Sequence, residues 1–234
     1  MNINRKKLGL GLLGLAGFAV VFVLLVSPVF GDRNGLQWAD SLFNRLSKES
    51  AYFVPKLRPQ AAQFEGTPFG AEVAARSDHE AGQVAALFTA AGCRASIDGT
   101  KVRIDGDLGA AAKALMADAE DMHYGRLDRL RTRYGFDGKE AIYGWWVAFD
   151  AIFDDYVTHR QVAASDFAIA MRTKVCEPAY NFCGIEPLRC SQAALPLAAL
   201  LLFYLVYTVW YGFSIMSLFE GAGIGPHAGR KREG

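Results

Sequence analysis

The chain has 234 residues, of which 52% are hydrophobic and 21% are charged, and its formal net charge at pH 7 is +1. The acidic excess of its middle segment, residues 32–192, excludes a polybasic nucleic-acid-binding face. The charged residues avoid two apolar runs, Leu8 to Gly31 and Cys190 to Phe219. Two such runs around a charged middle segment predict a membrane protein.

The first apolar run is long enough to cross a bilayer. As a helix, Leu8 to Val26 rises about 28 Å, against a hydrocarbon core of ~30 Å. Basic residues before it predict a cytoplasmic tail at 1–7 and a transmembrane helix at 8–30 that serves as a signal anchor. The alternative is a cleavable signal peptide ending near Gly31, but the apolar core exceeds the usual ~7 to 15 residues of a secretory signal.

Glycine recurs every three residues in this run, at Gly11, Gly14 and Gly17. A stripe of small residues permits close approach of a second helix in the membrane. Glycine is also common in membrane-spanning helices, so the alternative is that these glycines have no role in helix packing.

The middle segment, 31–192, is large enough for one domain. Residues 32–192 hold 19 Lys or Arg and 22 Asp or Glu, so the domain is mildly acidic. An amphipathic helix is expected from Gly35 to about Ser50. Repeated Pro and Gly then predict an extended linker at about 54–76.

A helix, a hairpin and a longer helix are expected next. Ser77 with Glu80 three residues later forms a capping-box pattern, and the helix should end at Gly92. Two short runs, Cys93–Ile97 and Lys101–Asp105, surround Asp98-Gly99-Thr100, which predicts a tight β-hairpin. Apolar residues at helical spacing then predict one long helix from Leu108 to Tyr134.

Two further helices are predicted from Gly138 to His159 and from Gln161 to Val175, before Pro178 and Gly184 interrupt the chain. The first is aromatic over a wide face, which favours core packing over a ligand pocket. The expected fold is therefore a helix-rich α+β extracytoplasmic domain flanked by two transmembrane helices.

The second apolar run predicts a transmembrane helix at 193–219, followed by a basic cytoplasmic tail at 220–234. Both termini are thus expected in the cytoplasm. The helix concentrates aromatic residues at mid-bilayer depth, which favours packing against another helix. The residues expected to take part are Tyr204, Tyr207, Trp210 and Tyr211.

The four cysteines suggest disulfides. Cys176, Cys183 and Cys190 recur at intervals of seven, and Cys93 lies far away. In an oxidising periplasm, four cysteines most simply form two disulfides, one of which staples the segment near the membrane. Free thiols, or a metal or cluster site, are the alternatives, and the sequence does not fix the pairing.

Two charged clusters are weaker candidates. Three carboxylates and one imidazole share one predicted helix, and two of them are four residues apart, a spacing that brings two metal ligands to one face. They are therefore a candidate metal site. The alternative is a solvated face, which acidic residues opposite an apolar stripe normally form. These residues are Asp150, Asp154, Asp155 and His159. Arg126, Arg129 and Arg133 are a candidate docking patch for an acidic partner or lipid headgroups, although basic residues also complement a helix C-terminus.

No catalytic motif is found, and neither run holds the ionisable residues that mark transport pathways. Short basic tails favour a bacterial inner-membrane protein with a periplasmic domain. We therefore expect a non-catalytic subunit or assembly factor of an envelope complex, in contact with other integral membrane subunits and with a homo-oligomer left open. No cofactor is predicted. The alternative is a membrane-anchored module that binds a metal, haem or another redox cofactor.

Overall fold

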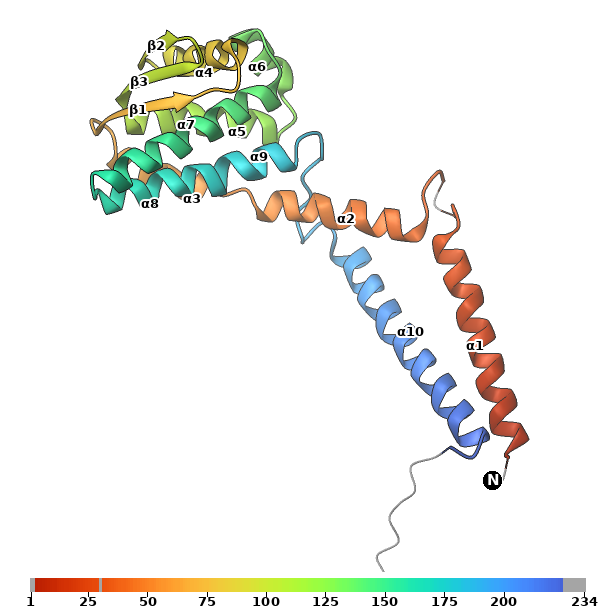
Figure 1. The fold of residues 1–234 in the computed structure, drawn as a ribbon. Helices are drawn as coiled ribbons and strands as arrows, with labels where there is room; N and C mark the ends of the chain where they lie inside the picture. Colours follow the sequence, from red (N-terminus) through yellow and green to blue (C-terminus); the bar gives the residue numbers. More distant parts are fainter. Residues whose placement is uncertain (1–2, 30, 225–234) are drawn as a thin grey trace, which may run out of the picture. The chain divides into compact units, whose positions relative to one another are not determined.

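The computed structural model describes residues 3–29 and 31–224 (Figure 1). It forms two compact units. One contains the described residues up to Phe43 and from Cys190 onward, and the other contains Asn44–Arg189. We call them the helix hairpin and the 44–189 domain.

The helix hairpin consists of α1, Arg5–Val26, and α10, Ala194–Gly221. Both are long and apolar enough to cross a membrane, by length and composition. They run antiparallel, because the backbone N–H of Asn4 donates to the carbonyl of Gly221 at 2.9 Å while Phe18 contacts Tyr207. The two apolar helices predicted from the sequence are therefore present, α1 beginning three residues before and ending four residues before the predicted 8–30.

The 44–189 domain is mainly helical. It begins within α2, Gly35–Ser50. The elements that follow are α3 Val54–Gln63, β1 Pro68–Ala74, α4 Asp78–Ala90, β2 Arg94–Asp98, β3 Lys101–Asp107, α5 Leu108–His123, α6 Leu127–Tyr134, α7 Gly138–Thr158, α8 Val162–Met171, a π-helix Arg172–Cys176 and α9 Glu177–Asn181.

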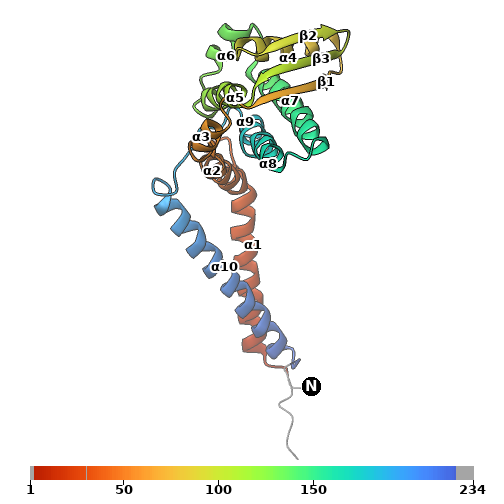
Figure 2. The same ribbon diagram turned by 90° about the vertical axis from the view of Figure 1, so that its left-hand side faces the viewer.

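The three strands form one antiparallel sheet in the order β1-β3-β2 (Figure 2). The predicted hairpin is confirmed: Asp98 pairs with Lys101, and Gly99 in the connecting turn has φ 57°. Val102 and Ile104 are fully buried, whereas Arg103 between them is exposed. One face of the sheet therefore covers the core and the other meets solvent.

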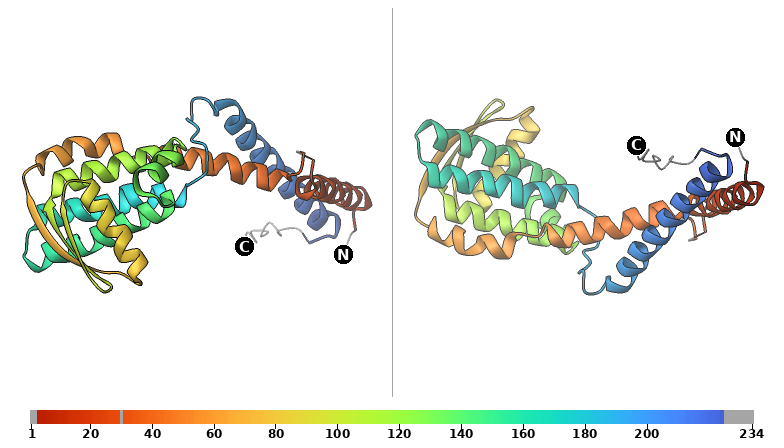
Figure 3. Two further views of the ribbon diagram at one scale, coloured as in Figure 1. Left: turned by 90° about the horizontal axis from the view of Figure 1, so that it is seen from above. Right: turned by 90° about the horizontal axis from the view of Figure 1, so that it is seen from below.

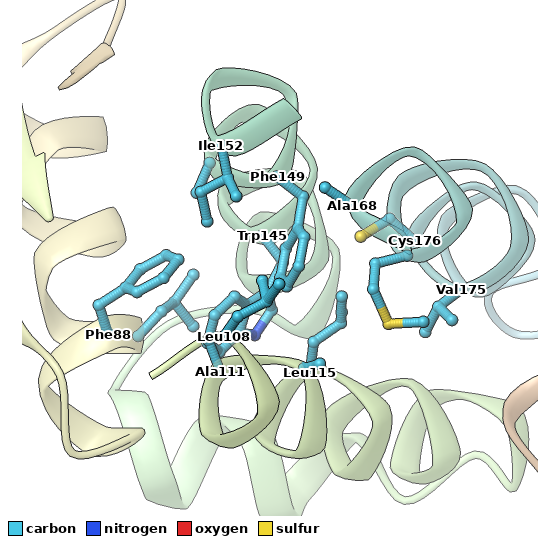
Figure 4. Close-up of a cluster of buried hydrophobic side chains, with 14 of the residues drawn as sticks. Phe88, Leu108, Ala111, Leu115, Trp145, Phe149, Ile152, Ala168, Val175 and Cys176 are labelled. Atoms are coloured by element: carbon cyan, nitrogen blue, oxygen red, sulfur yellow. The ribbon is translucent and has the colours of Figure 1, made fainter. Parts of the chain in front are cut away.

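The core lies between the sheet and the helices. Helices α5, α7 and α8 run side by side (Figure 3), and Trp145 and Phe149 of α7 are fully buried. Figure 4 shows Phe88, Leu108 and Phe149 clustered around Trp145. The aromatic face of α7 is thus a packing face, as the width of its apolar stripe indicated.

The expected linker at 54–76 is wrong, because the structure has α3 and β1 there. Pro55 lies in the first turn of α3, where a missing N–H costs nothing. Pro68 is the first residue of an edge strand, which also tolerates proline. Only alternate residues of β1, including Phe69 and Val73, are buried.

Two helix boundaries also differ from expectation. The predicted single helix from Leu108 to Tyr134 is broken at Gly125, which has φ 70°, and the N–H of Arg126 returns to the carbonyl of Asp121. Conversely, the helix expected to end at Val175 continues to Asn181. There the N–H of Glu177 bonds five residues back to Arg172, and this π turn precedes Pro178, whose missing N–H falls in the first turn of α9.

Glycine at position 109 lets α5 begin against the end of α3. A Cβ atom there would lie 2.6 Å from the backbone nitrogen of Glu65, whereas a Cβ on Gly82 in α4 meets nothing within 4 Å. We expect Gly109→Ala to lower the free energy of unfolding by about 1–3 kcal/mol through overpacking. The matched Gly82→Ala should raise it by ~0.5–1 kcal/mol, because alanine favours a helix. Denaturant unfolding of both variants checks the opposite signs, and equal effects would contradict the packing.

Candidate functional site

The predicted glycine stripe lies against α10 of the same chain. A Cβ atom on Gly11 would lie 2.7 Å from the backbone nitrogen of Leu218, and one on Gly17 would lie 2.8 Å from the Trp210 ring. A Cβ on Gly14 would overlap the Ser214 hydroxyl. The stripe is therefore occupied within the hairpin and is not a free surface for another helix.

The aromatic residues of α10 divide into two groups. Tyr207 stacks on Phe18 at 4.0 Å between ring centroids and donates its hydroxyl hydrogen to the Phe18 carbonyl at 3.1 Å. Tyr211 and Trp210 also face α1, whereas Tyr204 is 68% exposed. Sequence analysis missed Phe18, the ring on which Tyr207 and Tyr211 both rest.

A polar contact closes the end of the hairpin that is formed by the start of α1 and the end of α10. The Lys7 ammonium is 2.6 Å from a Glu220 carboxylate oxygen. Together with the bond from Asn4 to Gly221, this contact holds the start of α1 beside the end of α10.

The arginines of the candidate docking patch all form ion pairs within the chain, and the docking role stays a prediction. Arg126 and Arg129 lie 2.8 and 3.3 Å from a carboxylate oxygen of Asp121, and Arg133 pairs with Asp118. Because the chain turns back at Gly125, Arg126, Arg129 and Arg133 face acidic residues of α5. They stabilise the packing of two helices.

Asp118 is the buried centre of this network. Its carboxylate accepts hydrogen bonds from Trp145 Nε1 at 2.8 Å, from the Tyr134 hydroxyl at 2.6 Å and from Arg133. Burial raises the pKa of Asp118, while these donors oppose the shift. Asp118 is fully buried, and its three partners come from the helices packed around it. The raised pKa of Asp118 is therefore explained by its place in the core.

The candidate metal-site residues on α7 have partners within the chain, and the metal role stays a prediction. Asp150 is ion-paired with Arg172, and His159 Nδ1 lies 2.8 Å from the Asp155 carbonyl at the helix end. Among the described residues no group of three His, Cys, Asp or Glu side chains could hold a metal ion. Asp154 is exposed, and the predicted i, i+4 pair is present, with His159 Nδ1 3.5 Å from an Asp155 carboxylate oxygen.

The predicted disulfides are not formed. All four cysteines are free thiols. Cys93 is buried against Gly106 of β3, and Cys176 is fully buried beside α8 in the core, where burial raises the pKa of both thiols. Cys183 lies in the turn after α9 and Cys190 is exposed. The even spacing in sequence therefore does not bring the sulfur atoms together, because each lies on a different element.

The chain enters and leaves the 44–189 domain at one place, which we call the stem: residues 45–49 of α2 and residues 185–189. The N–H of Leu188 donates to the Arg45 carbonyl at 3.1 Å. The buried Lys48 ammonium donates to the carbonyls of Ile185, at 2.5 Å, and Met122, at 3.4 Å. Burial lowers the pKa of Lys48.

His123 lies beside the stem and is nearly buried. Its ring stacks on Tyr52 at 4.0 Å, and Nε2 is 3.3 Å from a Glu49 oxygen. His123, Tyr52 and Lys48 line a cavity of about 20 Å³, a space for about one water molecule and too small for a substrate. Burial of the imidazole lowers the pKa of His123, and the nearby Lys48 charge lowers it further by a smaller amount.

A larger hollow lies between α7 and α9. We call it the aromatic groove; its volume is about 290 Å³ and its walls include Tyr143, Trp146, Glu177 and Tyr180. Trp146 Nε1 donates to Glu177 at 3.3 Å. A volume near 300 Å³ with apolar walls and a few polar groups is typical of a ligand or peptide site.

The aromatic groove continues into a polar pocket of about 310 Å³ that shares Tyr143 and Tyr180 and includes Glu80. Cations of the chain already lie over the rings: the Arg76 guanidinium is 4.4 Å from the Tyr143 centroid, and Lys139 is 5.3 Å from that of Tyr180. One Glu80 oxygen pairs with Arg76, while the other is buried without a hydrogen-bond partner within the described chain. The rings and this carboxylate together favour a cationic ligand group.

Comparisons with known proteins give no relative: no family model, no curated protein and no solved structure matches the chain. The sites above therefore stand on their geometry alone.

Substitution within the hairpin tests the glycine packing. Gly14→Val should separate α1 from α10, because its side chain would overlap Ser214. Carbodiimide should join Lys7 to Glu220 in the native chain, and we expect Gly14→Val to reduce the yield of that cross-linked peptide several-fold. Gly9→Val is the control, since a Cβ on Gly9 meets nothing within 4 Å. An equal yield in both variants would contradict the packing.

The pH dependence of stability tests the environment of His123. Because its pKa is lowered on folding, the unfolded chain binds the proton first, so stability is complete above about pH 6.5 and falls as the pH drops below it. We expect His123→Gln to lose less stability between pH 7.5 and 5.5 than the native chain does, as measured by urea unfolding. The control His159→Gln alters an exposed imidazole and should keep the native loss.

Proposed function

We propose that the protein is a two-pass membrane protein that acts as a non-catalytic subunit or assembly factor of a larger bacterial envelope complex. The observation that carries this proposal is the helix hairpin. Its glycine face is fully used by contact between α1 and α10, while the outer faces of both helices are apolar and exposed, as at Leu13 and Leu201. Such faces need lipid or the helices of other subunits.

The proposed orientation places both termini in the cytoplasm and the 44–189 domain in the periplasm. Arg5, Lys6 and Lys7 precede α1, and basic residues near a span favour the cytoplasmic side. The Lys7–Glu220 contact supports a common side for both ends of the hairpin.

The aromatic groove is the proposed contact for a partner polypeptide that presents a lysine or arginine side chain. Tyr143, Trp146 and Tyr180 offer ring faces, and each already attracts a cation of this chain. Glu177 lies on the groove wall, and the unpartnered Glu80 oxygen lies in the adjoining pocket. A partner cation could replace Arg76 or Lys139 over these rings and gain the carboxylates as acceptors.

Isolation of the tagged protein from its native membrane in mild detergent tests this function. We expect it to migrate on a native gel in an assembly that contains other polypeptides. Tyr180→Ala should reduce the amount of the partner at least ten-fold, because truncation of an aromatic anchor commonly costs ~2 kcal/mol or more.

Val157→Ala is the matched control, because Val157 is exposed on α7 outside the groove; this variant should retain the partner. Migration without other polypeptides, together with stoichiometric metal or pigment, would contradict the proposal and favour a cofactor-binding module.

A further inference from the structure

Strand β2 forms an open edge of the sheet. It pairs with β3 on one side, and no other strand of the described chain lies on its other side (Figure 1). Ser96, Ile97 and Asp98 are exposed. An uncovered edge presents backbone donors and acceptors to another strand.

The register identifies the groups at this edge. The N–H of Ala75 donates to the Thr100 carbonyl at 2.8 Å, so Val102 and Ile104 also direct their backbone groups toward β1. Arg103, between them, must then bond to Ser96 of β2. By the same alternation, Ala95 and Ile97 direct their N–H and C=O groups outward.

We propose that β2 pairs with β2 of a second copy of this chain, antiparallel, about a two-fold axis at Ser96. In this register each Ala95 exchanges both backbone hydrogen bonds with Ile97 of the other copy, so every outward group is used. A shift by two residues toward the start of β2 would require Cys93, whose N–H already bonds to Phe88. A shift the other way would require Gly99, which lies in the turn.

The side chains of β2 are self-complementary in the same register. Arg94 lies opposite Asp98 of the second copy on the solvent face, and opposite charges directly across an antiparallel pair attract. Arg94 makes no ion pair within the described residues. On the other face Ile97, which is 51% exposed at the end of the core, lies opposite Ala95. Pairing therefore covers an apolar side chain that the helices leave uncovered.

The opposite edge of the sheet lacks this complementarity. Pro68 of β1 has no N–H, and its carbonyl accepts the Tyr156 hydroxyl at 3.2 Å. Glu72 is already ion-paired with Lys101. Since proline and side-chain contacts protect an edge, β2 and not β1 is the pairing strand. Anchorage of both copies in one membrane would raise their effective concentration.

Cysteine cross-linking in native membranes tests this pairing. In full-length Cys183→Ser/Cys190→Ser protein, Ser96→Cys should form a disulfide-linked dimer on mild oxidation. Two Ser96 positions would form a non-hydrogen-bonded pair with Cα atoms ~4.5 Å apart, within the ~4.4–6.8 Å range of disulfides. Arg103→Cys is the control, because this exposed β3 residue would lie three strand spacings, about 14 Å, from its own copy.

Charge exchange tests the register. Asp98→Arg in the Ser96→Cys protein should reduce dimer formation several-fold, and Arg94→Asp added to it should restore the dimer. An unchanged unfolding midpoint confirms that each variant is folded. Equal cross-linking of Ser96→Cys and Arg103→Cys, absence of a dimer, or a cross-link to a different protein would overturn the proposal. Asp98→Arg without effect would also overturn the register.

Discussion

The 44–189 domain begins and ends at the same place, and the rest of that domain depends on this constraint. The stem meets it directly: Leu188 bonds to Arg45, and Lys48 joins Ile185 to the end of α5. These contacts hold the two ends of the 44–189 domain together without any contribution from the helix hairpin. Bringing the two ends of the domain together costs conformational entropy, and the hydrogen bonds of the stem offset that cost.

The buried charges of the domain serve this architecture. Lys48 satisfies backbone carbonyls, and Asp118 accepts from Trp145, Tyr134 and Arg133. Burial of each charged group costs free energy, and loss of its hydrogen-bond partners would destabilise the fold further. Perturbed pKa values commonly mark functional sites, but here the perturbed groups have structural partners. The aromatic groove differs in offering ring faces at its surface, next to a pocket in which one buried Glu80 oxygen has no hydrogen-bond partner among the described residues.

Local signals in the sequence were sufficient for local structure. The Ser77 cap, the turn at Gly99 and the two apolar helices all depend on residues close together in the chain, and the structure contains them. Predictions failed where distant residues decide. Distant residues also engage one member of each charged cluster, since Asp150 pairs with Arg172 and Arg133 with Asp118. Strand β1 was missed because its proline and glycine suggested a linker, although its alternate burial at Phe69 and Val73 follows strand periodicity.

The two proposed contacts of the 44–189 domain use different elements and different chemistry. The aromatic groove between α7 and α9 combines ring faces with carboxylates, whereas the β2 edge offers backbone groups and a complementary Arg94–Asp98 pair. Occupation of one does not consume residues of the other. A dimer formed through β2 would therefore still present two aromatic grooves, one on each copy. Two linked grooves bind a partner that has two matching sites far more tightly than either groove alone. Two grooves on one dimer would give the proposed assembly two equivalent attachment points for a partner.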